Sequence, residues 1–342
     1  MVRKSLFLFG ILLLSLLVAC GSNESSGEVA DEAAEGQTDN DSSETSIDYP
    51  TQTINMIVPW GAGGDTDVIN RITNEYLSEE LDGVNFVVTN IGGGGGSIGA
   101  QEALNEDPDG YTLLAGHDSI GLSELMGNTS FSYFDFEPVA LLTSASQIIA
   151  TSVHNDWDSM EDVVEQLKDD PGSISFGAAF GSTSHTLPLG IEDAADVKFN
   201  IVNYEGTSQR TTALLGNHVH LGATTIPAAQ EYIKADQLKL LGISSPERNP
   251  SLPDVPTLIE QGIDAVNATN RGYFFPKDTP QEIVEIMSDA IGRVAENPEY
   301  IAQMEEMGVE VVYKPHDEYS EYLETSNDYL AEMLERQGIV DQ

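Results

Sequence analysis

The chain has 342 residues and a formal net charge of −43, because 57 Asp and Glu stand against 14 Lys and Arg. This balance excludes nucleic acid as a partner, since a protein that binds the phosphate backbone needs basic patches. An acidic surface keeps a protein soluble in a saline habitat, so we expect the charge to lie on the solvated face and away from the functional site. The length suits about two domains.

The first residues have the pattern of an export signal. Arg3 and Lys4 precede an apolar run over residues 5–19 that is too short to span a membrane comfortably. The run ends in LVAC, which resembles a bacterial lipobox and implies cleavage before Cys20 and a diacylglyceryl chain on its sulfur. An ordinary signal peptide that ends near a cysteine is the alternative.

We therefore predict a lipoprotein signal peptide at residues 1–19 and a lipid anchor on Cys20. The protein is then exported and held at the outer face of the bacterial cell membrane, on its extracellular or periplasmic side. Residues 20–49 are predicted to be a disordered acidic linker, because the stretch 21–50 holds nine acids, no Lys or Arg, and no aromatic before Tyr49. As Cys20 is the only cysteine, no intramolecular disulfide is possible.

From Thr53 onward, strand patterns alternate with helical patterns. Strands are expected at residues 54–60, 84–90, 111–116, 137–153 (one or two runs), 174–180, 199–204, 219–225, 238–244 and 270–276. Helices are expected at residues 68–81, 97–106, 160–168, 208–216, 226–235, 257–262, 280–297 and 319–337. This alternation predicts an α/β fold with parallel sheets covered by helices, in which ligands bind at the carboxyl ends of strands.

Two glycine-rich loops each follow a strand and open a helix, GAGGDTD at residues 61–67 and GGGGGSIGA at residues 92–100. Free N–H groups at a helix start bind anions, and glycines let the backbone come close to a ligand. Arg71 is the only Lys or Arg between residues 5 and 167, so an anion in this half must be held mainly by backbone dipoles. Plain turn chemistry with a capping Asp or Thr is the alternative, but two such loops in succession favour a site.

A dinucleotide site is a weaker interpretation of the second loop. Gly94, Gly96 and Gly99 satisfy GxGxxG, and Asp118 falls near the place of a ribose-binding acid. The motif carries little weight in a run of five glycines, and an exported lipoprotein meets little NAD. We therefore expect no cofactor.

Five segments, in this order, resemble the Bug-type receptors of the tripartite tricarboxylate transporter family. They are residues 49–71, 87–116, 181–187, 202–219 and 250–262. The resemblance implies a type II-like, two-lobed periplasmic-binding-protein fold, with a mostly parallel sheet flanked by helices in each lobe and two crossover strands at the hinge. It also implies capture of a small di- or tricarboxylate by lobe closure and delivery to the transmembrane permease subunits, with no catalytic activity.

In that family the first two loops clasp one carboxylate through backbone N–H groups and ordered waters, and the acid equivalent to Asp67 caps a helix. Three positions near the predicted cleft depart from the family pattern. Trp60 stands where many members carry Phe, Glu205 where Lys is frequent, and Thr224 where an acid is common. The identity of the carboxylate is therefore left open.

The far end of the ligand is assigned to residues after strands of the other lobe. Ser182 and Thr183 could hold it with local N–H groups, and Arg210 suits bidentate carboxylate binding, with a surface role as the alternative. The predicted ligand-binding residues are Trp60, Gly61, Ala62, Gly63, Gly64, Asp65, Thr66, Gly94, Gly95, Gly96, Ser97, His117, Asp118, Ser119, Gln147, Gly181, Ser182, Thr183, Tyr204, Gly206, Thr207, Arg210 and Thr224.

The histidines are assigned structural roles. His185 is expected to bond across its loop, and Ser184–His185 makes a poor nucleophile pair because no orienting acid is evident. His218 and His220 would share one strand face, but further ligands at metal-binding spacing are missing from the sequence pattern. We therefore predict no catalytic residues and no metal site.

We predict that residues 50–145 and 243–342 form lobe one and that residues 146–242 form lobe two. The protein is expected to be a monomer whose partners are a small carboxylate, the permease and the membrane, with no nucleic acid. A carboxylate sensor that serves a signalling partner and an exported hydrolase are the alternatives. The hydrolase would need a nucleophile, a base and an orienting group in one cleft.

Overall fold

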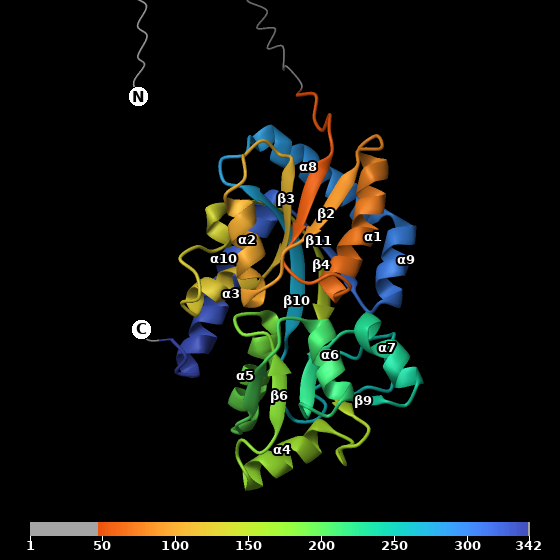
Figure 1. The fold of residues 1–342 in the computed structure, drawn as a ribbon, viewed down its shortest axis with the longest axis vertical. Helices are drawn as coiled ribbons and strands as arrows, with labels where there is room; N and C mark the ends of the chain where they lie inside the picture. Colours follow the sequence, from red (N-terminus) through yellow and green to blue (C-terminus); the bar gives the residue numbers. More distant parts are fainter. Residues whose placement is uncertain (1–46, 341–342) are drawn as a thin grey trace, which may run out of the picture. The chain divides into compact units, whose positions relative to one another are not determined.

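The computed structural model describes residues 47–340, so the predicted signal peptide, Cys20 and most of the predicted linker lie outside the described residues. The described chain builds two β-sheets, each flanked by helices (Figure 1). This two-sheet α/β architecture confirms the fold class expected from the sequence. No helix within residues 47–340 is both long and apolar enough to cross a membrane.

The first sheet has six strands in the order β11-β4-β10-β3-β1-β2. Their bounds are β1 Ile54–Val58, β2 Phe86–Asn90, β3 Thr112–His117, β4 Phe136–Ser146, β10 Ala268–Pro276 and β11 Glu310–Pro315. β1 runs parallel to β2 and β3, whereas β10 is antiparallel to both β3 and β4. The sheet is therefore mixed where we expected a mostly parallel one, because the chain returns from the second sheet at the edge where β3 ends.

Helices cover both faces of the first sheet, and their bounds are α1 Asp65–Glu80, α2 Ser97–Leu104, α3 Ser119–Leu125, α8 Gln281–Glu296, α9 Pro298–Glu306 and α10 His316–Arg336. Each face of this sheet has its own hydrophobic core. Successive side chains of β3 contribute alternately to the two cores, because neighbouring side chains of a strand point to opposite faces. Leu113 and Ala115 pack in one core, which includes residues of α1, α8 and α9. Leu114 packs in the other, with residues of α2 and α10.

The second sheet has five strands in the order β7-β6-β8-β5-β9 and is also mixed. Its strands are β5 Ile148–Ser152, β6 Ser175–Ala178, β7 Asn200–Asn203, β8 Leu221–Thr224 and β9 Leu238–Ile243. The helices that follow them are α4 Met160–Asp169, α5 Thr183–Ala195, α6 Thr207–Leu215 and α7 Ile226–Lys234. The core on one face includes residues of α4 and α5, and that on the other includes residues of α6.

The chain passes between the sheets twice, at Gln147 and through residues 244–267, and the two passages are bonded to each other. Gln147 N–H donates to Ser244 Oγ at 3.0 Å, and Ser244 N–H donates to the Gln147 carbonyl at 2.9 Å. Leu258 and Ile263 pack in the core of the second sheet. These contacts place Leu258 and Ile263 with the second sheet, whereas the sequence prediction assigned all residues from 243 onward to lobe one.

Several elements differ from the sequence prediction. Residues 257–262 form turns rather than the expected short helix, because Thr257 pairs as an isolated bridge with Ile243. β11, α3, α5 and α9 were not predicted. The first turn of α1 starts at Asp65, three residues before the first apolar position of the helical pattern.

Candidate functional site

A cavity of about 460 Å³ lies between the two sheets, and side chains from both of them line it. Its walls are the loops after β1, β2, β6, β7 and β8, each of which joins a strand to a following helix, together with His117 at the end of β3, Gln147 and Thr269. This volume is typical of a site for a small molecule. The strand ends therefore converge on one cavity, as the α/β pattern predicts.

Most of the predicted ligand residues line this cavity. They are Trp60, Gly61, Ala62, Gly64, Asp65, Thr66, His117, Gln147, Ser182, Thr183, Gly206, Thr207, Arg210 and Thr224. The predicted residues outside its lining are Gly63, Gly94, Gly95, Gly96, Ser97, Asp118, Ser119, Gly181 and Tyr204. Lining residues that the prediction did not include are Gly92, Gly93, Ala179, Ser184, Glu205, Ser208, Gln209, Thr225 and Thr269.

The first glycine loop presents the start of α1 to the cavity. Gly64 is the N-cap residue of α1 and provides no side-chain cap, so the first N–H groups of the helix are not bonded by a capping side chain. Asp67 instead turns back and accepts the Gly63 N–H at 2.8 Å, while Arg71 forms an ion pair with it. Asp67 thus fixes the loop, and it does not line the cavity.

The second glycine loop mainly serves close packing. Gly92 and Gly93 line the cavity, whereas a Cβ on Gly95 would lie 2.6 Å from the carbonyl oxygen of Phe180, in the loop after β6. A Cβ on Gly96 would lie 2.7 Å from the Trp60 ring. The absence of a side chain at Gly95 and Gly96 therefore allows the loop after β6 and the Trp60 indole to pack closely against this loop. The spacing of the glycines in the sequence did not indicate this packing role.

Trp60 and His117 form a stacked pair in the cavity wall, with ring centroids 3.8 Å apart and an interplanar angle of 12°. Burial, together with the positive charge of Arg271, lowers the pKa of His117 well below its usual value. His117 is thus neutral at pH 7, and the indole and imidazole together present an aromatic wall without charge.

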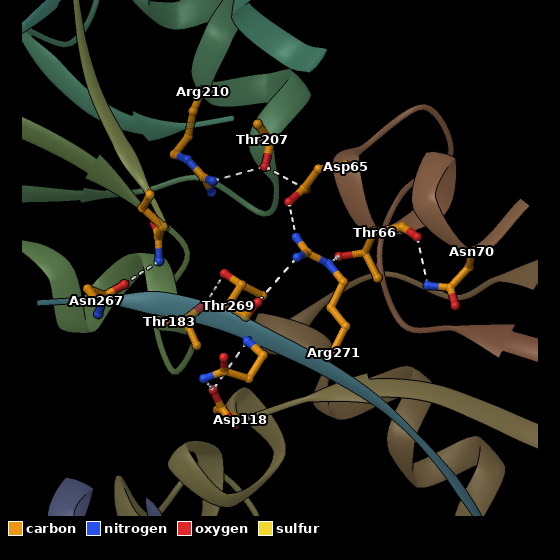
Figure 2. Close-up of polar contacts among 12 residues, drawn as sticks. Asp65, Thr66, Asn70, Asp118, Thr183, Thr207, Arg210, Asn267, Thr269 and Arg271 are labelled. Carbon is orange, nitrogen blue, oxygen red and sulfur yellow. Dashed lines mark hydrogen bonds and ion pairs between the residues drawn. The ribbon is translucent and has the colours of Figure 1, made fainter. Parts of the chain in front are cut away.

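Arg210 is a buried cation in the cavity wall, and Figure 2 shows its guanidinium next to Thr207. Its Nε donates to the Ala223 carbonyl at 3.0 Å, and one terminal nitrogen donates to Thr207 Oγ1 at 3.1 Å. Burial lowers the pKa of Arg210 to about 10, and Asp65 opposes that effect, so the guanidinium stays charged at neutral pH. No carboxylate among residues 47–340 forms an ion pair with it.

Thr224, which follows the Ala223 that Arg210 contacts, has a buried hydroxyl without a hydrogen-bond partner among residues 47–340. The residue is only 2% exposed. A buried hydroxyl without a partner is unfavourable, so a polar atom of a ligand in the cavity would stabilise it. Helix α6 also begins at this side of the cavity. Its N-cap residue is Gly206, which has no side chain that could cap the helix.

Arg271 is a buried residue that the sequence reasoning missed. It lies on β10, and its guanidinium forms an ion pair with Asp65 and donates to Thr66 Oγ1 at 3.1 Å (Figure 2). Burial would raise the pKa of Asp65, but Arg271 and then Arg210 outweigh it and lower that pKa below its usual value. The one sequence feature that could have pointed to Arg271 is that it is a lone arginine next to the apolar residues of a predicted strand.

The other histidines have structural contacts. His220 Nδ1 accepts the Ser175 N–H at 3.0 Å, and its ring meets the edge of Trp157. His218 and His220 precede β8 rather than lying on it, contrary to the expected strand. His185 stacks on Phe180 and is largely buried. No group of three potential metal ligands occurs among residues 47–340.

Asp118 lies outside the cavity lining and is buried beneath β10. Its Oδ2 accepts the Asn270 side-chain amide at 2.8 Å, and its Oδ1 accepts the Tyr322 hydroxyl at 3.3 Å. Burial raises the pKa of Asp118 to about 6, against the effect of these hydrogen bonds. The folded protein thus binds this proton more tightly than the unfolded chain does.

The stabilising contribution of Asp118 is fully present below about pH 4 and is lost as the pH rises through about 6. Each pKa unit corresponds to about 1.4 kcal/mol, so the contribution changes by about 3 kcal/mol over this range. Asp118→Asn cannot titrate, so its free energy of unfolding, relative to that of the wild type, should increase between pH 4 and pH 6. Urea denaturation of both proteins at each pH measures this difference, and parallel pH profiles would contradict the assignment.

Two mixed sheets joined by two connections, with a cavity at the strand ends that residues of both sheets line, define a solute-binding receptor of the periplasmic-binding-protein class. The chain belongs to the receptors of the tripartite tricarboxylate transporter family. The family profile, described as "Tripartite tricarboxylate transporter family receptor", matches residues 69–339. The resemblance seen in the sequence is thereby confirmed.

Similar proteins agree with this assignment. The protein BugT of Bordetella pertussis is 30% identical over 277 residues, which cover 79% of this chain and 84% of BugT. The solved structure of the periplasmic binding protein BugD is 27% identical, with a TM-score of 0.80 over 86% of this chain and 100% of BugD. MatC of Rhodopseudomonas palustris, solved with bound malate, is 24% identical and shares the fold, with a TM-score of 0.77 over 84% of this chain and 100% of MatC.

Proposed function

We propose that the protein captures a small di- or tricarboxylate outside the cytoplasm by closing its two lobes and delivers it to the permease of a tripartite tricarboxylate transporter. The observation that carries the proposal is Arg210, a buried guanidinium in the cavity wall without an ion-pair partner among residues 47–340. A buried charge is costly unless it is paired. An anionic group of the ligand would pair it.

The two ends of such a ligand meet different kinds of donor. The loop that begins α1 lines the cavity at Gly61, Ala62, Gly64, Asp65 and Thr66, and the free N–H groups of a helix start favour an anion. Across the cavity, Arg210, the Thr224 hydroxyl and the start of α6 form a second set of donors. A molecule with an acid at each end fits this arrangement, and lobe closure would exclude water from both ends.

A thermal-shift screen tests the proposed function. The panel contains propionate, malate, succinate and citrate, with sodium chloride at the same ionic strength as each carboxylate solution as the control. A ligand that binds only the folded state raises the melting temperature in a saturable way, so we expect shifts for the di- or tricarboxylates. Absence of a shift beyond the sodium chloride control for every carboxylate would refute the proposal.

We propose that Cys20 carries the lipid that tethers the receptor to the membrane, because LVAC ends the apolar run before it. Cys20→Ser removes the sulfur that would be acylated. We expect the variant to accumulate unprocessed or to leave the membrane fraction, as measured by fractionation and mass spectrometry of the N-terminus. A normally processed variant that still partitions fully with membranes would exclude the anchor.

A further inference from the structure

The guanidinium of Arg271 has three polar partners in the described structure. It donates to Thr66 Oγ1 at 3.1 Å and to the Thr269 carbonyl at 3.3 Å, and a terminal nitrogen pairs with Asp65 (Figure 2). Its side chain is 4% exposed, and it is absent from the residues that line the cavity of the candidate site. Arg271 therefore contacts the residues that line the site rather than the space that a ligand would fill.

Asp65 joins the two sides of the cavity. One carboxylate oxygen pairs with Arg271 of the first sheet, and the other accepts the hydroxyl of Thr207 from α6 at 3.1 Å. The same Thr207 oxygen accepts an N–H of Arg210 at 3.1 Å. A single hydroxyl group thus separates the Asp65 carboxylate from the Arg210 guanidinium.

Two buried guanidiniums, those of Arg210 and Arg271, lie close to one partly buried carboxylate, that of Asp65. If Asp65 moved past the Thr207 hydroxyl, it could pair directly with Arg210, because guanidinium and carboxylate form strong bidentate pairs. Such an internal pair would satisfy Arg210 and occupy the position that an anionic group of the ligand needs. The contact of Asp65 with Arg271 opposes this movement.

We propose that Arg271 is a positioning residue that holds Asp65 away from Arg210 and so keeps Arg210 available to the ligand. This inference rests on the proposed function, in which the cavity binds an anion. The affinity for that anion then depends on whether Asp65 pairs with Arg271 or with Arg210. It assigns Arg271 and Asp65 a joint effect on affinity, although Arg271 itself does not contact the ligand.

Calorimetric titration with malate separates this effect from a merely structural one. Arg271→Met frees Asp65 and should weaken malate binding about tenfold or more, the value of about one hydrogen bond to a charged group. Asp65→Asn in the Arg271→Met background removes the competing charge and should restore most of the lost affinity. The matched control is Arg293→Met, which breaks an ion pair with Glu80 elsewhere in the protein and should leave affinity unchanged.

A loss of affinity in Arg271→Met that Asp65→Asn does not restore would overturn the inference, because Arg271 would then only support the start of α1. Unchanged malate binding in Arg271→Met would overturn it as well. Circular dichroism and the melting temperature of each variant establish that it is folded before titration.

A ligand-free measurement keeps the inference testable if no carboxylate binds, an outcome that would refute the proposed function alone. Double-mutant cycles on urea midpoints measure the coupling between Asp65 and Arg210, using Asp65→Asn and Arg210→Met. The coupling should be small with Arg271 present and larger in the Arg271→Met background, where Asp65 can pair with Arg210. Equal coupling in both backgrounds would contradict the positioning role.

Discussion

Replacing Arg210 with Met is expected to weaken the binding of a di- or tricarboxylate strongly. Met keeps an apolar stem but removes the charge that would face the ligand inside a closed cavity. Leaving one member of a buried charge pair without its partner costs about 2–5 kcal/mol, so affinity should fall roughly 30-fold or more. If the ligand were a monocarboxylate with a neutral tail, the same change would have a small effect.

The control for this experiment is Arg248→Met. Arg248 is an exposed arginine that pairs with Glu260, and exposed pairs contribute little. Isothermal titration of both variants with malate, succinate and citrate gives the comparison, after their melting temperatures show that they are folded. Tight di- or tricarboxylate binding that is indifferent to Arg210→Met would mean that the second lobe does not recognise the ligand's charge.

The second large effect is expected from Gly95→Val, which should prevent ligand binding by keeping the lobes apart. Gly95 has a φ of 67°, and an added Cβ would lie 2.6 Å from the Phe180 carbonyl oxygen of the facing loop. A valine therefore needs both a strained backbone and a wider separation between the loops. Each sheet keeps its own core, so we expect the secondary structure to remain.

Gly172→Val separates the strain from the obstruction. Gly172 also has a positive φ, of 80°, but nothing lies within 4 Å of an added Cβ. Both variants should melt earlier than the wild type, but only Gly95→Val should lose carboxylate binding in calorimetric titration. In small-angle scattering with ligand, only Gly95→Val should fail to become more compact. Normal binding by Gly95→Val would show that close approach of the loops is unnecessary.

Local patterns sufficed to predict much of the fold and many of the residues that line the cavity. The loop at residues 61–67 could be recognised because its glycines, the preceding strand and the following helix are adjacent in sequence. The periodic apolar positions of α8 and α10 likewise depend on neighbours one turn away. Arg210 was predicted because it closely follows a strand that should end at the cleft.

Tertiary contacts explain what the sequence could not reveal. Arg271 finds its partner Asp65 at a separation of 206 residues, so no local pattern could connect them. The glycines at 94–96 were interpreted as ligand contacts, but the spacing could not show that Trp60 and Phe180 would pack against them. The mixed strand directions follow from where the chain re-enters each sheet, which short patterns do not encode.

The central claim is that the cavity recognises a negative charge at both ends of its ligand. The most direct measurement is isothermal titration of the wild-type protein with the diacid that gives the largest thermal shift and with its monoamide, which has the same length and one charge fewer. Because the lost charge would face buried Arg210 or the start of α1, we predict that the monoamide binds roughly 30-fold more weakly, or not at all. Equal affinity for the diacid and the monoamide would contradict the account.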